Sequence, residues 1–162
     1  TQTDATSQLI GLRYLSEKET TYFLEYYRNG GGFSRAQIKD FVTFVDRSYR
    51  TFGNTGNDSG LLRASALLDG PYGRPNPARH YLYFRASQKE PFDILYFTPA
   101  ITSIMNLTDA SLTVIPELTY SPMTNLELRF RTPVLLGKKG TEYGEKQNDY
   151  RVEFRIRYHF GL

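Results

Sequence analysis

Five arginines and two glutamates in the last third of the chain recur at alternate positions among apolar residues. They are Arg129, Arg131, Arg151, Arg155, Arg157, Glu127 and Glu153. Successive side chains of a strand point to opposite faces, so this spacing gathers the charges on one face of each strand. Guanidinium groups pair with carboxylates and phosphates, and rings of arginine in a pore favour anions. The pattern predicts either a site for anionic solutes or a ladder of ion pairs that cross-links neighbouring strands.

Two further charges, Glu25 and Arg85, lie in earlier segments whose alternation is weaker. Leu24 and Phe84 sit next to them and belong to the apolar positions of these segments. The period of two places Glu25 and Arg85 on the opposite face from these apolar neighbours. We therefore predict that both charges share the polar face with the arginines.

Signals for catalysis or metal binding are weak. His80 and His159 are the two histidines of the chain, and neither shows the spacing of a hydrolase triad or a metal site. Asp58, Ser59 and Asn76 fall in the loop region next to His80, which keeps a hydrolase as a third hypothesis. We otherwise expect a solvent-exposed His80, no metal, no cofactor and no enzymatic activity.

The segment Tyr150–Phe160 gives the strongest structural signal. Every even position in it is apolar or aromatic, and every odd position is charged or histidine. Such alternation predicts a strand with one apolar and one polar face. Its length matches the roughly 9–11 residues of a tilted membrane-spanning strand. A water-filled barrel lumen would solvate the whole polar face, whereas a soluble sandwich would have to expose it to solvent.

Weaker alternation predicts further strands, at about 8–15, 20–29, 80–88, 94–106, 112–121 and 126–136. Pro99, Pro116 and Pro133 fall inside them. Because proline removes a donor from the ladder, we expect bulges or strand ends at these points. Segment 94–106 is apolar on both faces, so its outward face stays open.

The connections alternate between short and long. Short ones are predicted at 16–19, 88–93 and 121–125, whereas 30–79 and 137–149 are long and the turn near Thr108-Asp109 is tight. Outer-membrane barrels have short periplasmic turns, longer extracellular loops and an even number of strands. Seven strands are countable here, so we expect the C-terminal part of a larger barrel. Counting 61–69 as an eighth strand would instead close a small barrel.

The loop 30–79 has helical features of its own. Ser34 precedes Gln37 at the spacing of a capping box, and apolar residues then recur at helical intervals. We predict a helix over about 35–52 that ends at Gly53, followed by a short helix over about 60–68. These helices either fold into the lumen as a constriction or pack over the mouth of the barrel.

Composition permits a membrane protein of this kind. Hydrophobic residues make up 40% of the chain and the mean hydropathy is −0.48. Only every second residue of a barrel strand meets lipid, so a low average does not exclude a barrel.

There is no cysteine, which excludes thiolate metal sites and disulfides, and the net charge of +3 is too small to indicate nucleic-acid binding. The first residues lack the basic and apolar regions of a signal peptide, so we expect a mature chain or a piece of a longer one.

The segment Tyr150–Phe160 resembles the C-terminal assembly signal of Gram-negative outer-membrane proteins, with alternating apolar residues and a late phenylalanine. Gly161 and Leu162 follow Phe160, whereas the pattern of these proteins ends on the aromatic residue. Segments 21–30 and 81–93 resemble the C-terminal third of larger porin-like barrels of proteobacteria. The resemblance implies an all-β antiparallel transmembrane barrel in the bacterial outer membrane. It also implies that lipid and the barrel-assembly machinery are partners, the latter through Tyr150–Phe160.

We therefore predict one barrel domain or barrel segment over residues 1–162, acting as a channel for small and preferably anionic solutes. The alternatives are a non-transporting scaffold or surface-binding barrel that contacts a partner through loop 30–79, an outer-membrane hydrolase, and a soluble β-sandwich or lipocalin-like barrel. Several aromatic residues near strand ends suit an interfacial girdle. They are Tyr14, Tyr22, Tyr26, Tyr120, Tyr150, Tyr158 and Phe160. The oligomeric state is left open.

Overall fold

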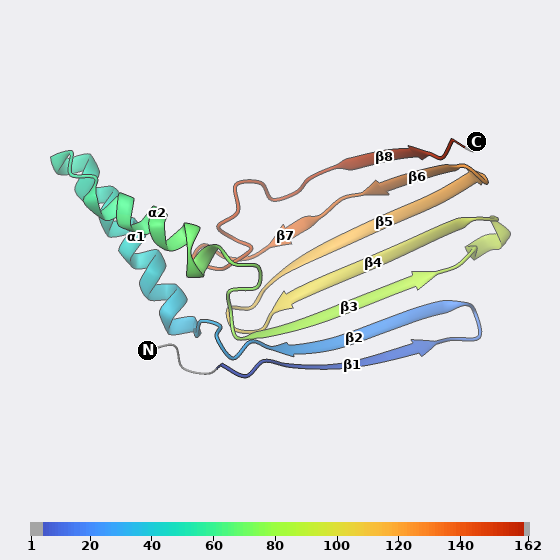
Figure 1. The fold of residues 1–162 in the computed structure, drawn as a ribbon, viewed down its shortest axis with the longest axis horizontal. Helices are drawn as coiled ribbons and strands as arrows, with labels where there is room; N and C mark the ends of the chain where they lie inside the picture. The colour runs from blue at the N-terminus through green and yellow to red at the C-terminus, as the bar shows by residue number, and fades with distance from the viewer. Residues whose placement is uncertain (1–4, 161–162) are drawn as a thin grey trace.

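Antiparallel strands are the largest class of regular structure in the computed structural model, which describes residues 5–160. The strands are β1 (Gln8–Leu15), β2 (Thr20–Arg28), β3 (His80–Gln88), β4 (Phe97–Asn106), β5 (Ser111–Met123), β6 (Leu126–Arg131), β7 (Val134–Leu136) and β8 (Glu153–Tyr158). They form one sheet in the order β1-β2-β3-β4-β5-β6-β8, with β7 paired to β5 (Figure 1). The predicted all-β antiparallel class is confirmed. The sheet is open, with β1 and β8 at its two edges.

Connections of different length lie at opposite ends of the sheet. The turns 16–19, 89–96 and 124–125 lie at one end, and we call this the short-turn end. The segments 29–79, 107–110 and 137–152 lie at the other end, which we call the loop end (Figure 1). This separation follows the predicted alternation of short and long connections.

Proline shapes the strands less than predicted. Pro133 does interrupt the expected strand 126–136, which appears as β6 and β7 on either side of it. At Pro99 and Pro116, however, the expected bulges are absent, because both residues keep their register in the β4–β5 ladder. The Pro116 carbonyl accepts a hydrogen bond from Thr132 N at 3.1 Å. The nitrogen and oxygen of a strand residue point the same way, so the missing N–H of Pro116 faces the break between β6 and β7.

The register carries one apolar face across the whole sheet. Residues paired across antiparallel strands share a face. One such row runs through Leu12, Leu24, Phe84, Ser103, Val114 and Val134. A second row runs through Leu118, Phe130 and Phe154. We call this side the apolar face.

The opposite side, the polar face, holds every predicted charged residue that lies within a strand. It also holds some apolar side chains, such as Phe23 and Ile104. The two faces resolve the ambiguity of segment 94–106: Ile101 lies on the apolar face and Ile104 on the polar face.

Burial in the sheet is the inverse of that in a soluble protein. Asn106 and Ser111 are 0% exposed, and both lie on the polar face. On the apolar face, Leu12 is 68% exposed and Phe154 is 64% exposed. Large apolar side chains normally supply the buried core of a water-soluble domain. Apart from Tyr81, the buried positions of the strands are small and polar, and most of the large apolar side chains lie on the exposed apolar face.

A helical hairpin interrupts the sheet between β2 and β3. Helix α1 (Arg35–Thr55) begins with the predicted capping box, in which Gln37 N donates to Ser34 Oγ and Ser34 N donates to Gln37 Oε1. The prediction that α1 ends at Gly53 is wrong, because the helix continues to Gly56, which has a φ of 71°. A glycine at this left-handed position is a common helix end. Helix α2 (Ser59–Asp69) follows the predicted range closely, so the alternative of a strand at 61–69 is wrong.

The helices pack mainly on each other and lie beyond the loop end of the sheet (Figure 1). Ser48 of α1 and Ala64 of α2 are buried. A stack of three rings connects the hairpin to its flanks, with Tyr72 between Phe33 and Phe41 at centroid distances of 4.0 Å each. No helix in the described part of the chain is long and apolar enough to cross a membrane.

Candidate functional site

Ion pairs on the polar face join strands β6 and β8. Arg131 donates to Glu153 through two nitrogens, at 2.7 and 3.2 Å. Glu127 lies 3.4 Å from Arg157 and 3.6 Å from Arg129. Antiparallel pairing places these side chains across from one another on one face. The structure thus brings the predicted charges of the last strands together.

Arg151 reaches the same cluster from outside the strands. It precedes β8 and contacts the Glu153 carboxylate, which is therefore shared between Arg131 and Arg151. The Arg151 side chain is 65% exposed, and a pair this exposed contributes little to stability.

A second ion pair crosses the middle of the sheet. Arg85 on β3 lies 3.1 Å from Glu117 on β5 and donates to Thr102 Oγ1 at 2.8 Å on the strand between them. Glu117 is also the register partner of Arg131, so it links the Arg85 pair to the β6–β8 cluster. We did not predict Glu117 as a site residue. Its alternation with Leu118 was the available signal, and its role emerges only when β5 is placed between β4 and β6.

Glu25 lies on the polar face as predicted but apart from the arginines. Its register partners are Gly11 and Tyr83. A Cβ atom on Gly11 would come within 3.0 Å of Glu25 Cγ, so the Glu25 side chain lies over this glycine. Among the described residues Glu25 forms no ion pair, and the structure does not join it to the arginine cluster.

Two arginines stand directly opposite each other in the cluster. Arg129 and Arg155 are register partners on β6 and β8. Within residues 5–160, Arg155 has no ion pair and the buried Nε of Arg129 has no hydrogen-bond partner. Like charges directly opposite are destabilising. Arg129 is partly offset by Glu127 at 3.6 Å, so Arg155 is the member of this pair that has no ion pair in the described part of the chain.

A buried polar cluster fastens the loop after β7 onto the polar face. The Glu142 carboxylate accepts hydrogen bonds from the Tyr81 hydroxyl at 2.6 Å and from Asn106 Nδ2 at 2.8 Å. Burial raises the pKa of the Glu142 carboxyl above its usual value, and the nearby Asp109 carboxylate adds to the effect. The loop thus presents a carboxyl group to the buried polar side chains of β3 and β4.

Asp109 holds the same loop from the β4–β5 turn. Its carboxylate accepts from Glu142 N at 2.7 Å and from Ser111 Oγ at 2.6 Å. Burial also raises the pKa of the Tyr143 hydroxyl next to this cluster. Sequence reasoning missed these contacts, because they join an irregular loop to two strands and match no motif.

His80 makes a contact that we did not predict. Its Nδ1 lies 2.8 Å from the Tyr26 hydroxyl. His80 is half-buried, so the prediction that it is solvent-exposed is wrong. The His80 backbone N–H donates to Thr108 Oγ1 at 3.2 Å. The contacts of His80 described here thus come from β2 and the β4–β5 turn rather than from Asp58, Ser59 or Asn76.

Comparison of the chain with protein-family models, with curated proteins and with solved structures finds no match.

Proposed function

We propose that this chain is a section of a transmembrane β-barrel in the bacterial outer membrane and that the barrel is a channel for small, preferably anionic solutes. The observation that carries the proposal is the inverted burial of the sheet. Apolar side chains cover one face and are exposed, while the other face buries polar residues and pairs its charges. A barrel in lipid requires this distribution, because its outer side meets hydrocarbon and its lumen meets water.

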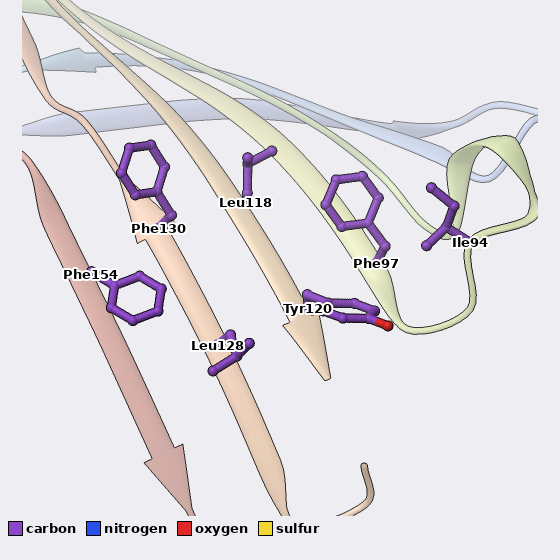
Figure 2. Close-up of a pocket in the computed structure, with 7 residues that line it drawn as sticks. All are labelled: Ile94, Phe97, Leu118, Tyr120, Leu128, Phe130 and Phe154. Carbon is purple, nitrogen blue, oxygen red and sulfur yellow. The ribbon is translucent and has the colours of Figure 1, made fainter. Parts of the chain in front are cut away.

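The outward apolar side chains form a continuous surface. Figure 2 shows Phe97, Leu118, Phe130 and Phe154 on one side of neighbouring strands. They line a shallow hollow of about 300 Å³ together with Ile94, Tyr120 and Leu128. Exposed apolar patches of this extent indicate contact with an apolar partner, and lipid chains fill irregular hollows of this kind.

Aromatic residues of the apolar face gather near the short-turn end. Tyr14 stacks on Tyr22 at a centroid distance of 6.2 Å, and Tyr158 meets Phe160 edge to face at 4.8 Å. Tyr120 contacts Phe97 between these two pairs, at 6.4 Å. Aromatic residues concentrate where a barrel crosses the membrane interface. The row supports an interface at this end of the sheet.

Strand direction constrains how the sheet could close. Every step from β1 to β8 is antiparallel, and the path has seven strand positions because β6 and β7 share one. Strands β1 and β8 therefore run in the same direction (Figure 1). A closed and wholly antiparallel barrel needs an odd number of further strands between them. Such strands would also cover both edges, which otherwise invite aggregation.

The arginines give the channel its expected selectivity. Arginine in a pore favours anions and repels cations. Arg155 has no ion pair among the described residues, so it offers an uncompensated charge next to Arg129. The flanking glutamates hold the other arginines in place rather than cancelling every charge of the cluster.

The test is conductance of the full-length protein in a planar bilayer under a salt gradient. We expect ion-conducting pores whose reversal potential shows anion preference. Arg155→Gln should reduce that preference, while Arg63→Gln on α2 should leave it unchanged. A protein that inserts but stays electrically silent would contradict the channel proposal.

Insertion without conductance would favour the second candidate function, a non-transporting scaffold. The surface of the helical hairpin supports this candidate. Tyr49 is 70% exposed and Leu62 is 64% exposed on its surface. Exposed aromatic and aliphatic side chains are typical anchors of protein contacts. In that case truncation of the hairpin should abolish binding of a partner without affecting insertion.

A further inference from the structure

We infer that the cleft between the start of α1 and residues 138–141, here called the mouth cleft, binds a small soluble polyanion that carries phosphate or carboxylate groups. This inference deepens the proposed function, because it places a solute site at the loop end of the polar face. It concerns equilibrium binding, which can be measured whether or not the barrel conducts.

Positive charge dominates the lining of the mouth cleft. Its volume is about 890 Å³, and its cations are Arg35, Lys39, Lys138 and Lys139. None of these four forms an ion pair within the described part of the chain. This contrasts with the polar face of the sheet, where glutamates engage most arginines.

The two acids of the mouth cleft do not cancel its charge. Asp109 is buried, and its oxygens already accept from the backbone and hydroxyl of Ser111 and from the backbone of Glu142. Asp46 lies on α1, more than two turns beyond Arg35. Four cations face two acids here, so an anion with several oxygens would gain charge-assisted hydrogen bonds.

The start of α1 adds backbone polarity to the same wall. The first turn of α1 contains no acidic residue, and Arg35 is its first residue. The N–H groups of a first helical turn carry partial positive charge. This effect reinforces the cations but does not define the site, which rests on the charged cleft.

The loop that carries Lys138 and Lys139 is held in a fixed shape. Thr141 Oγ1 donates to the Lys138 carbonyl at 2.6 Å and accepts from Gly144 N at 3.2 Å. A Cβ atom on Gly144 would lie 2.1 Å from the Lys138 carbonyl oxygen, so only glycine fits there. Glu142 then anchors the loop to Tyr81 and Asn106. A fixed backbone lowers the entropy lost when the two lysines that it carries gather around an anion.

The experiment is calorimetric titration of inorganic pyrophosphate into the full-length protein in zwitterionic nanodiscs. We expect one site whose affinity falls as salt rises. Replacing both lysines, Lys138→Gln with Lys139→Gln, should weaken binding by about tenfold or more. The matched control, Lys18→Gln with Lys89→Gln, changes two lysines at the short-turn end and should bind as the unaltered protein does. Equal binding by both double variants would overturn the inference.

A second variant separates a built site from loose charge attraction. Glu142→Ala removes a negative charge, so charge attraction alone predicts tighter pyrophosphate binding. The inference predicts weaker binding, because Glu142 is a positioning residue for the loop. Tighter binding by this variant would overturn the fixed-loop site.

A lipid headgroup carries the same phosphate chemistry, so the nanodisc composition distinguishes the two sources. Pyrophosphate should still bind when part of the lipid is anionic. Loss of pyrophosphate binding in anionic nanodiscs would mean that lipid headgroups occupy the cleft, and the proposal of a soluble ligand would be refuted. Calorimetry measures binding independently of conductance, so the two proposals can fail separately. A protein that binds pyrophosphate but does not conduct would refute the channel alone. A protein that conducts but does not bind pyrophosphate would refute this inference alone.

Discussion

At the scale of single residues, the polar face combines charges that are satisfied with charges that are not. Arg131 and Glu153 match in a fork geometry that fixes both side chains. Arg129 and Arg155 oppose each other without such a match. The sequence predicted which residues share the face, because parity along a strand needs no tertiary information. It left open which partner each arginine takes, since that depends on register between strands.

The Arg85–Glu117 pair should stabilise the sheet measurably. The side chains of Arg85 and Glu117 are 31% and 13% exposed. Glu117→Gln therefore leaves the partly buried Arg85 guanidinium without its counter-charge. We expect a loss of about 1–2 kcal/mol in the free energy of unfolding by urea. Glu17→Gln, in the exposed turn between β1 and β2, is the control and should change stability little. Equal values for the two variants would show that the pair contributes nothing.

Glu142 should make stability depend on pH in an unusual direction. Its pKa is raised in the folded protein, so the folded state binds the proton more tightly than the unfolded chain does. The free energy of unfolding therefore falls as pH rises from the ordinary carboxyl value to the raised one, and this contribution levels off above that window. Glu142→Gln keeps an acceptor oxygen for Tyr81 and Asn106 but removes the titration.

Urea unfolding at a series of pH values measures this effect as the difference between the Glu142→Gln variant and the unaltered protein. We expect the variant to gain relative stability with rising pH across the window. A difference that runs the opposite way would mean that the hydrogen bonds to Glu142 outweigh its burial.

At the scale of elements, β1, β2 and β3 follow the local pattern closely, whereas β8 does not. The alternation over Tyr150–Phe160 predicted a strand of eleven residues, but β8 covers only Glu153–Tyr158. Strand β1 spans the predicted residues, since alternation and flanking turns agree there. Helix α1 passes Gly53, which is compatible with a glycine cost of only about 1 kcal/mol relative to alanine, and ends at Gly56 in the left-handed conformation. Pro116 stays inside β5 because its missing donor faces a gap between β6 and β7. Neither outcome can be read from the residue alone, because each depends on what the neighbouring element leaves unpaired.

Two glycines of the helical hairpin should respond in opposite ways to alanine. A Cβ atom on Gly53 would meet nothing within 4 Å, so Gly53→Ala should stabilise the hairpin by about 0.5–1 kcal/mol. A Cβ atom on Gly60 would lie 2.5 Å from Ser48 Oγ, so Gly60→Ala should destabilise it by about 1–3 kcal/mol. Hydrogen exchange of the α1 and α2 amides measures both changes. If protection from hydrogen exchange rose in both variants, the close approach of Gly60 to Ser48 would be contradicted.

At the scale of the whole molecule, a single sheet has two faces of different chemical character. The register sorts most large aliphatic and aromatic side chains to one face, although Tyr81, Tyr83 and Ile104 lie on the other. The exposed fractions invert the order expected in water. The sequence indicated these faces strand by strand, most clearly over Tyr150–Phe160. The packing of loop 137–149 onto the polar face, and with it the mouth cleft, could not be predicted, because it depends on the buried contacts of Glu142 and Asp109.

The most direct test asks whether the apolar face touches lipid. Residues 1–162 contain no tryptophan, so a single substitution supplies the only tryptophan within this chain, and its signal is the difference from the unaltered protein. Leu118→Trp and Thr119→Trp place the probe on adjacent residues of β5, at the same depth but on opposite faces. In membranes containing brominated lipid chains, we predict strong quenching and a blue-shifted spectrum for Leu118→Trp and little quenching for Thr119→Trp. Equal quenching of the two, or quenching of neither, would contradict a sheet whose apolar face meets the membrane.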